Sequence, residues 1–335
     1  MKRFWLAAIT AAGVLLSGCG SRQYFEPEVR YEAPVARHYE GTVIDVGREG
    51  VTLSNGHYIG KEGVSTLTLG EGYRFLNENS RYVLASNAEG KLKIIDKKTQ
   101  KTVRNEDLGF PVVAASVYRG YVVYVLENNA YGLYRIADGV RVSENRSEPT
   151  YAIDARAASP VFVDTLAVVP MLDGKLIIFD IHDPENASVI YLSSERNLNN
   201  VIVLERSGDT LVAATPKKVL VIGDEEYERR ANISDVKVYR NRLYLFTKDG
   251  RIQTLSLTLE PMTQQKFKFA QFVAVDVAKD KVFALDKQGS LIVLDSNLKK
   301  AKIYDVGEVE TPVFMYGGTL YKDGNIIDLT RLSYE

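Results

Sequence analysis

The chain has 335 residues, of which 45% are hydrophobic and 25% are charged, proportions that exclude a wholly disordered protein. Its 42 Lys and Arg balance 43 Asp and Glu, so no concentrated positive field is available to bind a nucleic acid. The 20 Tyr and 12 Phe against one Trp favour a sheet-rich fold, because aromatic and β-branched residues suit pleated strands.

The chain begins with a short basic segment followed by an apolar one. Lys2 and Arg3 precede an apolar run over residues 4–16. That run is shorter than the roughly 20 residues that span a bilayer, and it fits the apolar region of a signal peptide. Leu16-Ser17-Gly18-Cys19 comes next and resembles the lipobox of bacterial lipoproteins. We therefore expect residues 1–18 to be a lipoprotein signal peptide.

The lipobox resemblance implies cleavage before Cys19, a diacylglycerol thioether on its sulfur and an acyl chain such as palmitate on its amino group. Cys19 is the only cysteine, which modification explains better than packing; an ordinary secretory signal with a stray cysteine is the alternative. Gly20 and Ser21 follow, without the Asp that often retains lipoproteins in an inner membrane. The outer membrane is therefore favoured, with the periplasmic side preferred to the cell surface.

Residues 19–40 are expected to be the lipidated cysteine and a flexible tether, since this Pro-containing, charged stretch keeps neither helical nor strand periodicity for long. A flexible chain of this length reaches about 25 Å on average, enough to lift a domain clear of lipid head groups. The remaining residues, 41–335, are expected to form one domain.

A seven-residue pattern recurs through that domain. Gly90–Asp96 reads GKLKIID, Gly174–Asp180 reads GKLIIFD and Gly289–Asp295 reads GSLIVLD, with a weaker copy at Gly250–Ser256. The opening glycines at positions 90, 174, 250 and 289 are 84, 76 and 39 residues apart, so the period is near 40 residues. A period of this size indicates one supersecondary unit per repeat.

Each unit reads as four short strands. Around the third copy we expect strands at 160–163, 166–169, 175–181 and 187–192, with Asp173-Gly174 forming a tight hairpin. Helical patterning is nearly absent after the signal. The sequence therefore predicts an all-β fold, a β-propeller of four-stranded antiparallel blades.

Six complete modules begin near residues 71, 111, 159, 198, 232 and 270. The segments 41–69 and 311–335 are shorter. If the two segments form separate blades, the ring has eight blades. If they merge into one blade, with an N-terminal strand closing the C-terminal blade, the ring has seven. Eight is preferred, and the termini should meet in either ring because closure removes the open edges.

The glycine-led repeats at Gly90, Gly174 and Gly289 resemble the pyrroloquinoline-quinone-type propeller repeat. With the lipobox, the chain resembles the BamB-like outer-membrane lipoproteins, although it lacks the Trp that their repeats often carry. The resemblance implies a non-enzymatic, periplasm-facing scaffold, monomeric outside its complex, that contacts BamA or other envelope proteins and assists assembly of outer-membrane β-barrel proteins. No interface residue of that family can be carried over position by position.

No cofactor is expected. Quinoprotein dehydrogenases on this fold need a Trp and a disulfide around the quinone, whereas Trp5 lies in the signal and Cys19 has no partner. The three histidines, His38, His57 and His182, are far apart in sequence, so we expect turn residues rather than metal ligands.

Carboxylates recur at the ends of the repeat strands, at Asp96, Asp180, Asp295 and Asp328. We interpret them as caps that accept hydrogen bonds from local backbone amides, since active-site residues should break a repeat. Two alternatives to the scaffold stay open. One is a cell-surface adhesin or ligand-binding propeller; the other is a periplasmic glycan-active hydrolase or lyase, which would place two or more carboxylates outside the repeat pattern in a central cavity.

Loops and strand edges should carry the partner contacts of a scaffold. The candidate contact residues are Glu127, Asn128, Asn129, Asn197, Asn199, Asn200, Asp224, Glu225, Glu226, Arg229 and Arg230.

Overall fold

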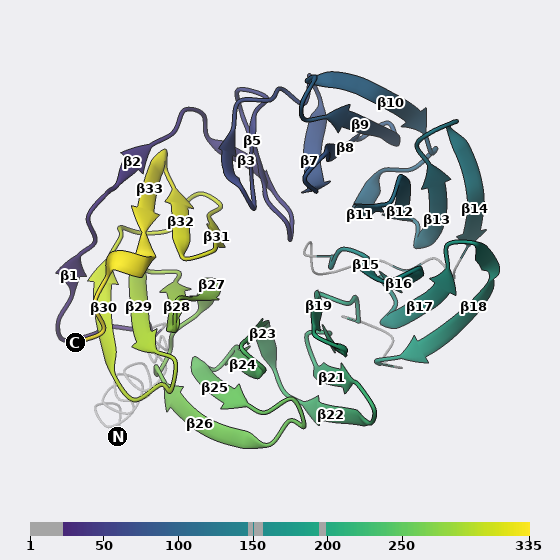
Figure 1. The fold of residues 1–335 in the computed structure, drawn as a ribbon. Helices are drawn as coiled ribbons and strands as arrows, with labels where there is room; N and C mark the ends of the chain where they lie inside the picture. The colour runs from purple at the N-terminus through teal and green to yellow at the C-terminus, as the bar shows by residue number, and fades with distance from the viewer. Residues whose placement is uncertain (1–22, 147–149, 151–156, 194–198) are drawn as a thin grey trace, which may run out of the picture.

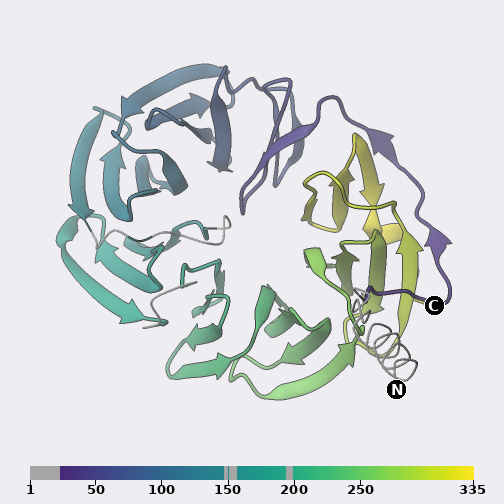
Figure 2. The same ribbon diagram turned by 180° about the vertical axis from the view of Figure 1, so that it is seen from behind.

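The computed structural model describes residues 23–146, 150, 157–193 and 199–335. Eight sheets, antiparallel except for the pairing of one N-terminal strand, are arranged around a central axis as the blades of a propeller (Figures 1 and 2). The prediction of an all-β propeller with eight blades is confirmed, and the helical structure in the described ranges amounts to η1 (Leu329–Arg331). No helix in this described part has the length and apolarity needed to cross a membrane.

Blades 1 to 4 each contain four strands that follow one another in the chain. Blade 1 contains β3 (Val43–Val46), β4 (Val51–Leu53), β5 (Tyr58–Gly60) and β6 (Gly63–Ser65). Blade 2 contains β7 (Tyr73–Glu78), β8 (Tyr82–Asn87), β9 (Lys91–Asp96) and β10 (Lys101–Asp107). Blade 3 contains β11 (Val112–Tyr118), β12 (Tyr121–Leu126), β13 (Ala130–Arg135) and β14 (Val140–Arg146). Blade 4 contains β15 (Val161–Val163), β16 (Leu166–Pro170), β17 (Lys175–Asp180) and β18 (Asp183–Tyr191).

Blades 5 to 8 complete the ring, and the last two also contain strands from the N-terminal segment. Blade 5 contains β19 (Val203–Ser207), β20 (Thr210–Ala214), β21 (Lys218–Ile222) and β22 (Glu226–Arg230). Blade 6 contains β23 (Ile233–Tyr239), β24 (Arg242–Thr247), β25 (Arg251–Leu255) and β26 (Pro261–Lys266). Blade 7 contains β27 (Phe272–Ala278), β28 (Lys281–Asp286), β29 (Ser290–Asp295), β30 (Ala301–Asp305) and β1 (Tyr31–Glu32). Blade 8 contains β31 (Phe314–Tyr316), β32 (Thr319–Lys322), β33 (Asn325–Asp328) and β2 (Arg37–His38).

The core lies between neighbouring blades. Middle strands such as β12 and β28 are buried along almost their whole length, because each of their faces packs on an adjacent sheet. Outer strands such as β10 and β22 alternate between exposed and half-buried side chains. This gradient explains why the repeat strands read as continuous apolar runs while the last strand of each module reads as polar.

The N-terminal segment closes the ring, which differs from the flexible tether expected over residues 19–40. Strand β1 pairs in parallel with β30, and β2 pairs antiparallel with β33. Phe25 is buried and packs edge-on against Phe267, with ring centroids 5.8 Å apart. The ring therefore has eight blades and also an N-terminal strand in its C-terminal blade, two features that were expected to exclude each other. The C-terminus lies beside β1, as expected for closure (Figure 1).

The recurring aspartates cap turns, as the repeat pattern predicted. Asp96 accepts the backbone N–H of Thr99 at 2.9 Å, and this hydrogen bond helps to hold the pKa of Asp96 below its usual range. Asp180 accepts the N–H of His182, and Asp295 accepts three N–H groups of the following turn. Asp328 accepts the N–H of Thr330 at the start of η1. These carboxylates lie at strand ends and do not line the axial cavity described below.

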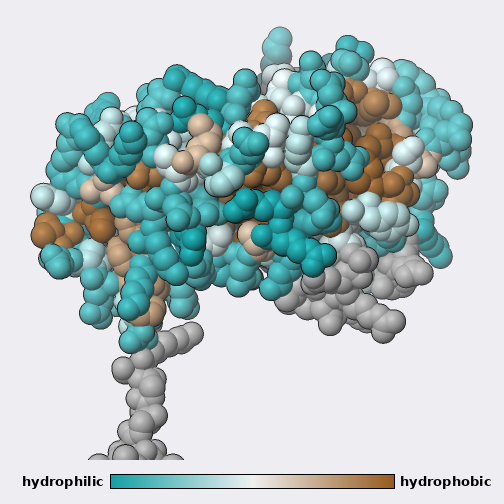
Figure 3. Space-filling view, turned by 90° about the horizontal axis from the view of Figure 1, so that it is seen from below, coloured by the Kyte–Doolittle hydropathy of each residue, from teal (hydrophilic) through white to brown (hydrophobic). Residues whose placement is uncertain are grey.

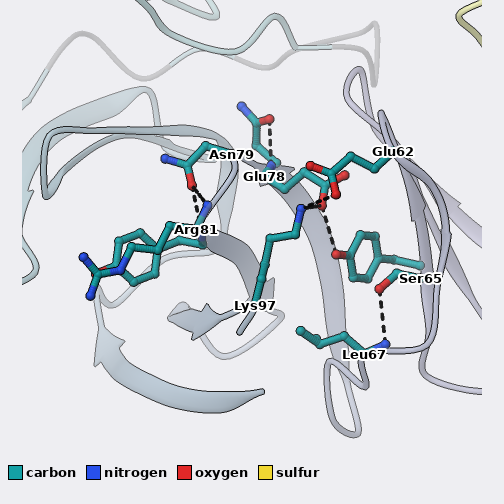
Figure 4. Close-up of polar contacts among 10 residues, drawn as sticks. Glu62, Ser65, Leu67, Glu78, Asn79, Arg81 and Lys97 are labelled. Atoms are coloured by element: carbon teal, nitrogen blue, oxygen red, sulfur yellow. Dashed lines mark hydrogen bonds and ion pairs between the residues drawn. The ribbon is translucent and has the colours of Figure 1, made fainter. Parts of the chain in front are cut away.

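A polar seam joins blades 1 and 2 (Figure 4). Lys97 contacts Glu62 at 2.7 Å and Glu78 at 3.0 Å, so one ammonium group bridges the two sheets. Tyr58 donates its hydroxyl hydrogen to Glu78 at 3.0 Å, and burial together with this carboxylate raises the pKa of Tyr58. Blade 1, whose strands are short, is thus joined to blade 2 by charge-assisted contacts as well as by apolar packing.

Two glycines with nearly the same φ allow the cost of backbone strain to be distinguished from the cost of steric crowding. Gly120 has φ +82° and open space where a methyl group would stand, whereas a Cβ on Gly289, at φ +84°, would lie 2.2 Å from the carbonyl oxygen of Gly307. Gly120→Ala is expected to cost about 1–2 kcal/mol of unfolding free energy from backbone strain. Gly289→Ala should cost at least twice as much, measured by urea denaturation, because backbone must also move. Equal costs would contradict this interpretation of the hairpin glycines.

Candidate functional site

The ring axis holds a polar cavity of about 460 Å³. The inner strands supply its wall together with Arg48 and Glu49 from the β3–β4 hairpin, and Figure 1 shows blade 1 extending toward the centre of the ring. Its charged lining consists of Arg48, Glu49, Lys61, Glu205, Arg206, Lys237 and Asp276. Uncharged polar lining comes from Asn77, Ser116, Ser159 and Tyr316.

Arg48 spans the ring from the tip of the β3–β4 hairpin. Its guanidinium contacts both carboxylate oxygens of Asp235 on β23, at 3.0 and 2.8 Å, and lies 3.9 Å from Glu205 on β19. Burial opposes the charged form, but Asp235 outweighs it and the pKa of Arg48 is raised. A bidentate pair of this kind fixes orientation as well as charge, so Arg48 links blade 1 to blades 5 and 6 across the axis.

Glu49, next to Arg48, forms a second ion pair. Its carboxylate lies 2.5 Å from the ammonium of Lys61. Burial would raise the pKa of Glu49, but Lys61 and Arg48 outweigh that effect and lower it. Glu49 is therefore ionised at neutral pH and lacks the raised pKa that a catalytic acid needs.

The Glu49 pair should make stability depend on acid pH. Because the folded-state pKa of Glu49 is lowered, its stabilisation is fully present above the ordinary Glu pKa of about 4.3 and is lost progressively as pH falls from there through the lowered folded-state pKa. Glu49→Gln should therefore lower the melting temperature at pH 7, and the difference from the unchanged chain should shrink near pH 4. A difference that does not change with pH would contradict this role.

Three charged residues occupy equivalent positions on neighbouring inner strands. Glu205, Lys237 and Asp276 lie on the first strands of blades 5, 6 and 7. Each lies two residues before the last residue of its strand that pairs with the second strand of the blade. These equivalent positions hold side chains of opposite charge and therefore break the repeat. That break is the signal from which the cavity residues could have been found in the sequence. The carboxylates that the hydrolase alternative requires in a central cavity are thus present.

Each cavity carboxylate, however, already has a structural partner. Glu205 accepts the N–H of Val238 at 3.1 Å, and Asp276 accepts the N–H of Gly318 at 2.7 Å. Glu49 is paired with Lys61. Within the described ranges no group of three or more His, Cys, Asp and Glu could hold a metal ion. These contacts hold the charged side chains of the cavity in fixed positions, which is the geometry of a binding site on the ring axis.

The histidines were expected to be turn residues, and His38 differs because it lies on a strand. His38 lies on β2, and His57 follows the Asn55-Gly56 turn, where its N–H binds Asn55. His182 packs its ring edge-on against Tyr121.

Several predicted contact residues are structural instead. Asn129 is fully buried in a left-handed turn at φ +64°, and it accepts the N–H of Leu172 in the next blade. Asn199 and Asn200 are also buried, and Asn199 accepts the hydroxyl of Ser193. Asn128 is half-buried and accepts the N–H of Ala130. Burial contradicts the predicted partner contact for Asn129, Asn199 and Asn200, because Asn suits both surface loops and left-handed turns, whereas for Asn128 it stays a prediction.

The charged candidates do lie on the surface. Glu127 is exposed at its turn, and Asp224, Glu225, Glu226 and Arg230 are exposed along β22 and the turn before it, with Arg229 half-buried. Asn197 and Cys19 lie outside the described residues. The face of the molecule in Figure 3 is largely hydrophilic, with hydrophobic residues exposed in several separate places.

No protein-family model matches the chain. In sequence, the chain is 27% identical over 372 residues to the plasminogen-binding protein PgbB of Helicobacter pylori strain J99, covering 96% of this chain and 68% of that protein. PgbB from a second Helicobacter pylori strain, 26695, is 26% identical, again over 96% of this chain and 68% of that protein. The similarity therefore runs through all of the blades and not through one motif.

In structure, the chain is similar to BamB from Moraxella catarrhalis, with a TM-score of 0.67 and 12% identity over 89% of this chain and 98% of that one. It is also similar to Sqt1 of Saccharomyces cerevisiae, with a TM-score of 0.65, 10% identity and shares of 90% and 99%. Such low identities establish the fold alone. The resemblance to BamB that the repeats predicted is confirmed at that level.

Proposed function

We propose that this chain is a lipid-anchored propeller of the bacterial envelope that binds another protein and catalyses no reaction. The observation that carries the proposal is the similarity along 96% of the chain to a protein named for plasminogen binding. The engaged carboxylates of the axial cavity support the non-enzymatic part. The partner we favour is plasminogen or a similar extracellular protein.

A plasminogen-binding role requires access to the outside of the cell. We therefore propose a position on the cell surface, anchored through acylated Cys19, in place of the periplasmic side preferred from sequence. Acyl chains on one cysteine would hold the ring at the membrane stably, since two or more chains anchor far better than one. Cys19→Ser should move the protein out of the membrane fraction, and its retention there would contradict the anchor.

The surface we propose for partner contact is the rim segment 224–230, which comprises β22 and the turn before it. Its outer strand exposes Glu226, Glu228 and Arg230 on one face, and its edge has no neighbouring strand in its described sheet. Charged rim groups act mainly on association rate and on salt dependence. An extracellular partner would therefore meet this segment through charge complementarity.

Plasminogen binding to the purified lipidated chain in detergent, measured by surface plasmon resonance, tests this proposal. Saturable binding is expected, with none to an unrelated plasma protein. The paired swap Glu226→Lys with Arg230→Glu should slow association several-fold, while Glu71→Lys, an exposed change in another blade, should not. Absence of plasminogen binding would overturn the favoured partner.

A second candidate is assistance in assembling outer-membrane β-barrel proteins. The shared architecture with BamB supports it, together with outer strands such as β18, nine residues long and open along its free edge in the described sheet. An added strand from a client or from BamA could pair there. Co-purification of BamA from detergent-extracted membranes would support this role, and its absence alongside plasminogen binding would reject it.

A further inference from the structure

The axial cavity presents opposite charges at one level of the ring. Glu205, Lys237 and Asp276 occupy equivalent register positions on β19, β23 and β27, and these inner strands are neighbours in that order. A carboxylate, an ammonium group and a second carboxylate therefore follow one another around the wall. This alternation belongs to three consecutive blades, whereas the corresponding residues of blades 2 and 3 are the uncharged Asn77 and Ser116.

These groups keep capacity for a ligand. Lys237 is half-buried on β23, and its ammonium group makes neither a hydrogen bond nor an ion pair with any residue that the structure describes. Asp276 uses its Oδ2 atom for Gly318, and across the described ranges its Oδ1 atom accepts no hydrogen bond. Ser116 accepts the amide of Asn77 at 2.9 Å, so its own hydroxyl hydrogen is available to donate. The cavity thus combines donors for a carboxylate with an acceptor for an ammonium group.

The charge balance favours a ligand without net charge. The lining cations are Arg48, Lys61, Arg206 and Lys237, and the anions are Glu49, Glu205 and Asp276 with Asp235 behind Arg48. Four positive and four negative groups sum to zero. A ligand carrying one charge would leave an excess in a partly enclosed site, which is costly, whereas a zwitterion would not.

We propose that the axial cavity binds a small zwitterion of the amino-acid type, a free amino acid or a dipeptide, with its carboxylate at Lys237 and its ammonium group at Asp276 and Glu205. The volume of about 460 Å³ lies within the range of small-molecule sites and exceeds what one water or ion needs. The Arg48–Asp235 pair would form part of the rigid wall and not contact the ligand's charges. This site is separate from the rim segment 224–230, so its occupancy does not depend on the proposed partner.

The test uses the full-length lipidated chain in detergent and isothermal titration calorimetry with dialanine, alanine, N-acetyl-dialanine and dialanine amide. Dialanine or alanine should bind with a dissociation constant of about 1 mM or tighter, and blocking either charge should weaken binding at least about tenfold. Stronger binding of dialanine than of alanine would indicate a peptide source, and the reverse a free amino acid. No binding of either compound, or equal binding of the blocked forms, would overturn the proposal.

Two variants test which residue binds the ligand's carboxylate and which binds its ammonium group. Lys237→Met should abolish the preference for dialanine over its amide, and Asp276→Asn should abolish the preference for dialanine over the N-acetyl form. Lys248→Met, an exposed change in the same blade, should leave both preferences intact. Should Lys237→Met fail to fold, the ligand series on the unchanged chain still decides. Unaltered preferences in a folded Lys237→Met protein would contradict the assignment.

Discussion

Replacing Arg48 by methionine is expected to lower the free energy of unfolding by about 3–5 kcal/mol, one of the two largest effects predicted for this ring. The side chains of Arg48 and Asp235 are only 11% and 13% exposed, so removing the guanidinium takes a bidentate, charge-balancing contact away from a nearly buried carboxylate. Methionine fills a similar volume, which limits the cavity contribution. Urea denaturation at pH 7, followed by circular dichroism, measures the loss.

The exposed pair Arg240–Asp280 provides a matched control. Its atoms are 2.6 Å apart, yet the side chains are 67% and 50% exposed. Arg240→Met should therefore cost less than about 1 kcal/mol. Adding Asp235→Asn to Arg48→Met should recover part of the loss, because it removes the carboxylate charge that the Arg48 guanidinium balanced. Equal costs for the two arginines would contradict a ring-spanning role for Arg48.

Deleting residues 23–39 is the second change with a large expected effect. It removes the closing strands β1 and β2 together with buried Phe25 and Tyr39. Loss of one buried Phe alone costs about 3–5 kcal/mol, and the deletion also exposes the edges of β30 and β33. The melting temperature should fall sharply, and proteolysis should begin in blade 8.

Two proline substitutions test closure without deletion. The N–H of Ala36 donates to the carbonyl of Ile326 at 2.8 Å, so Ala36→Pro removes a hydrogen bond of the closing ladder. The N–H of Val35 makes no such bond among the described residues, and Val35 is exposed. Ala36→Pro should therefore destabilise the ring more than Val35→Pro. Similar effects, or a deletion variant as stable as the parent, would show that closure contributes little.

Local sequence signals predicted the blades well. The glycine-led repeats, the Asp-Gly hairpins and the strand-end aspartates each act within one module, so their spacing reveals them. Strands β1 and β2 escaped prediction because each has two exposed residues and pairs with a segment over 250 positions away. Long-range pairing of so short a strand leaves no periodicity in the sequence.

The axial site was harder to predict for a related reason. Arg48 and Asp235 are 187 positions apart, and neither stands in a recognisable motif. Glu205, Lys237 and Asp276 became comparable only once the hairpin registers were known. Asn129 was assigned to the surface because its residue type favours turns, whereas its side chain binds the next blade. In each case, ring geometry determined the role of the residue.

Binding of labelled plasminogen to intact cells that carry this chain tests most directly whether an anchored propeller displays a protein-binding surface. Cells producing the unchanged chain should bind plasminogen saturably, and surface protease should remove that binding. Cells producing Cys19→Ser should bind at background level, because the ring is no longer held at the membrane. Equal plasminogen binding by cells with and without the chain would contradict the account.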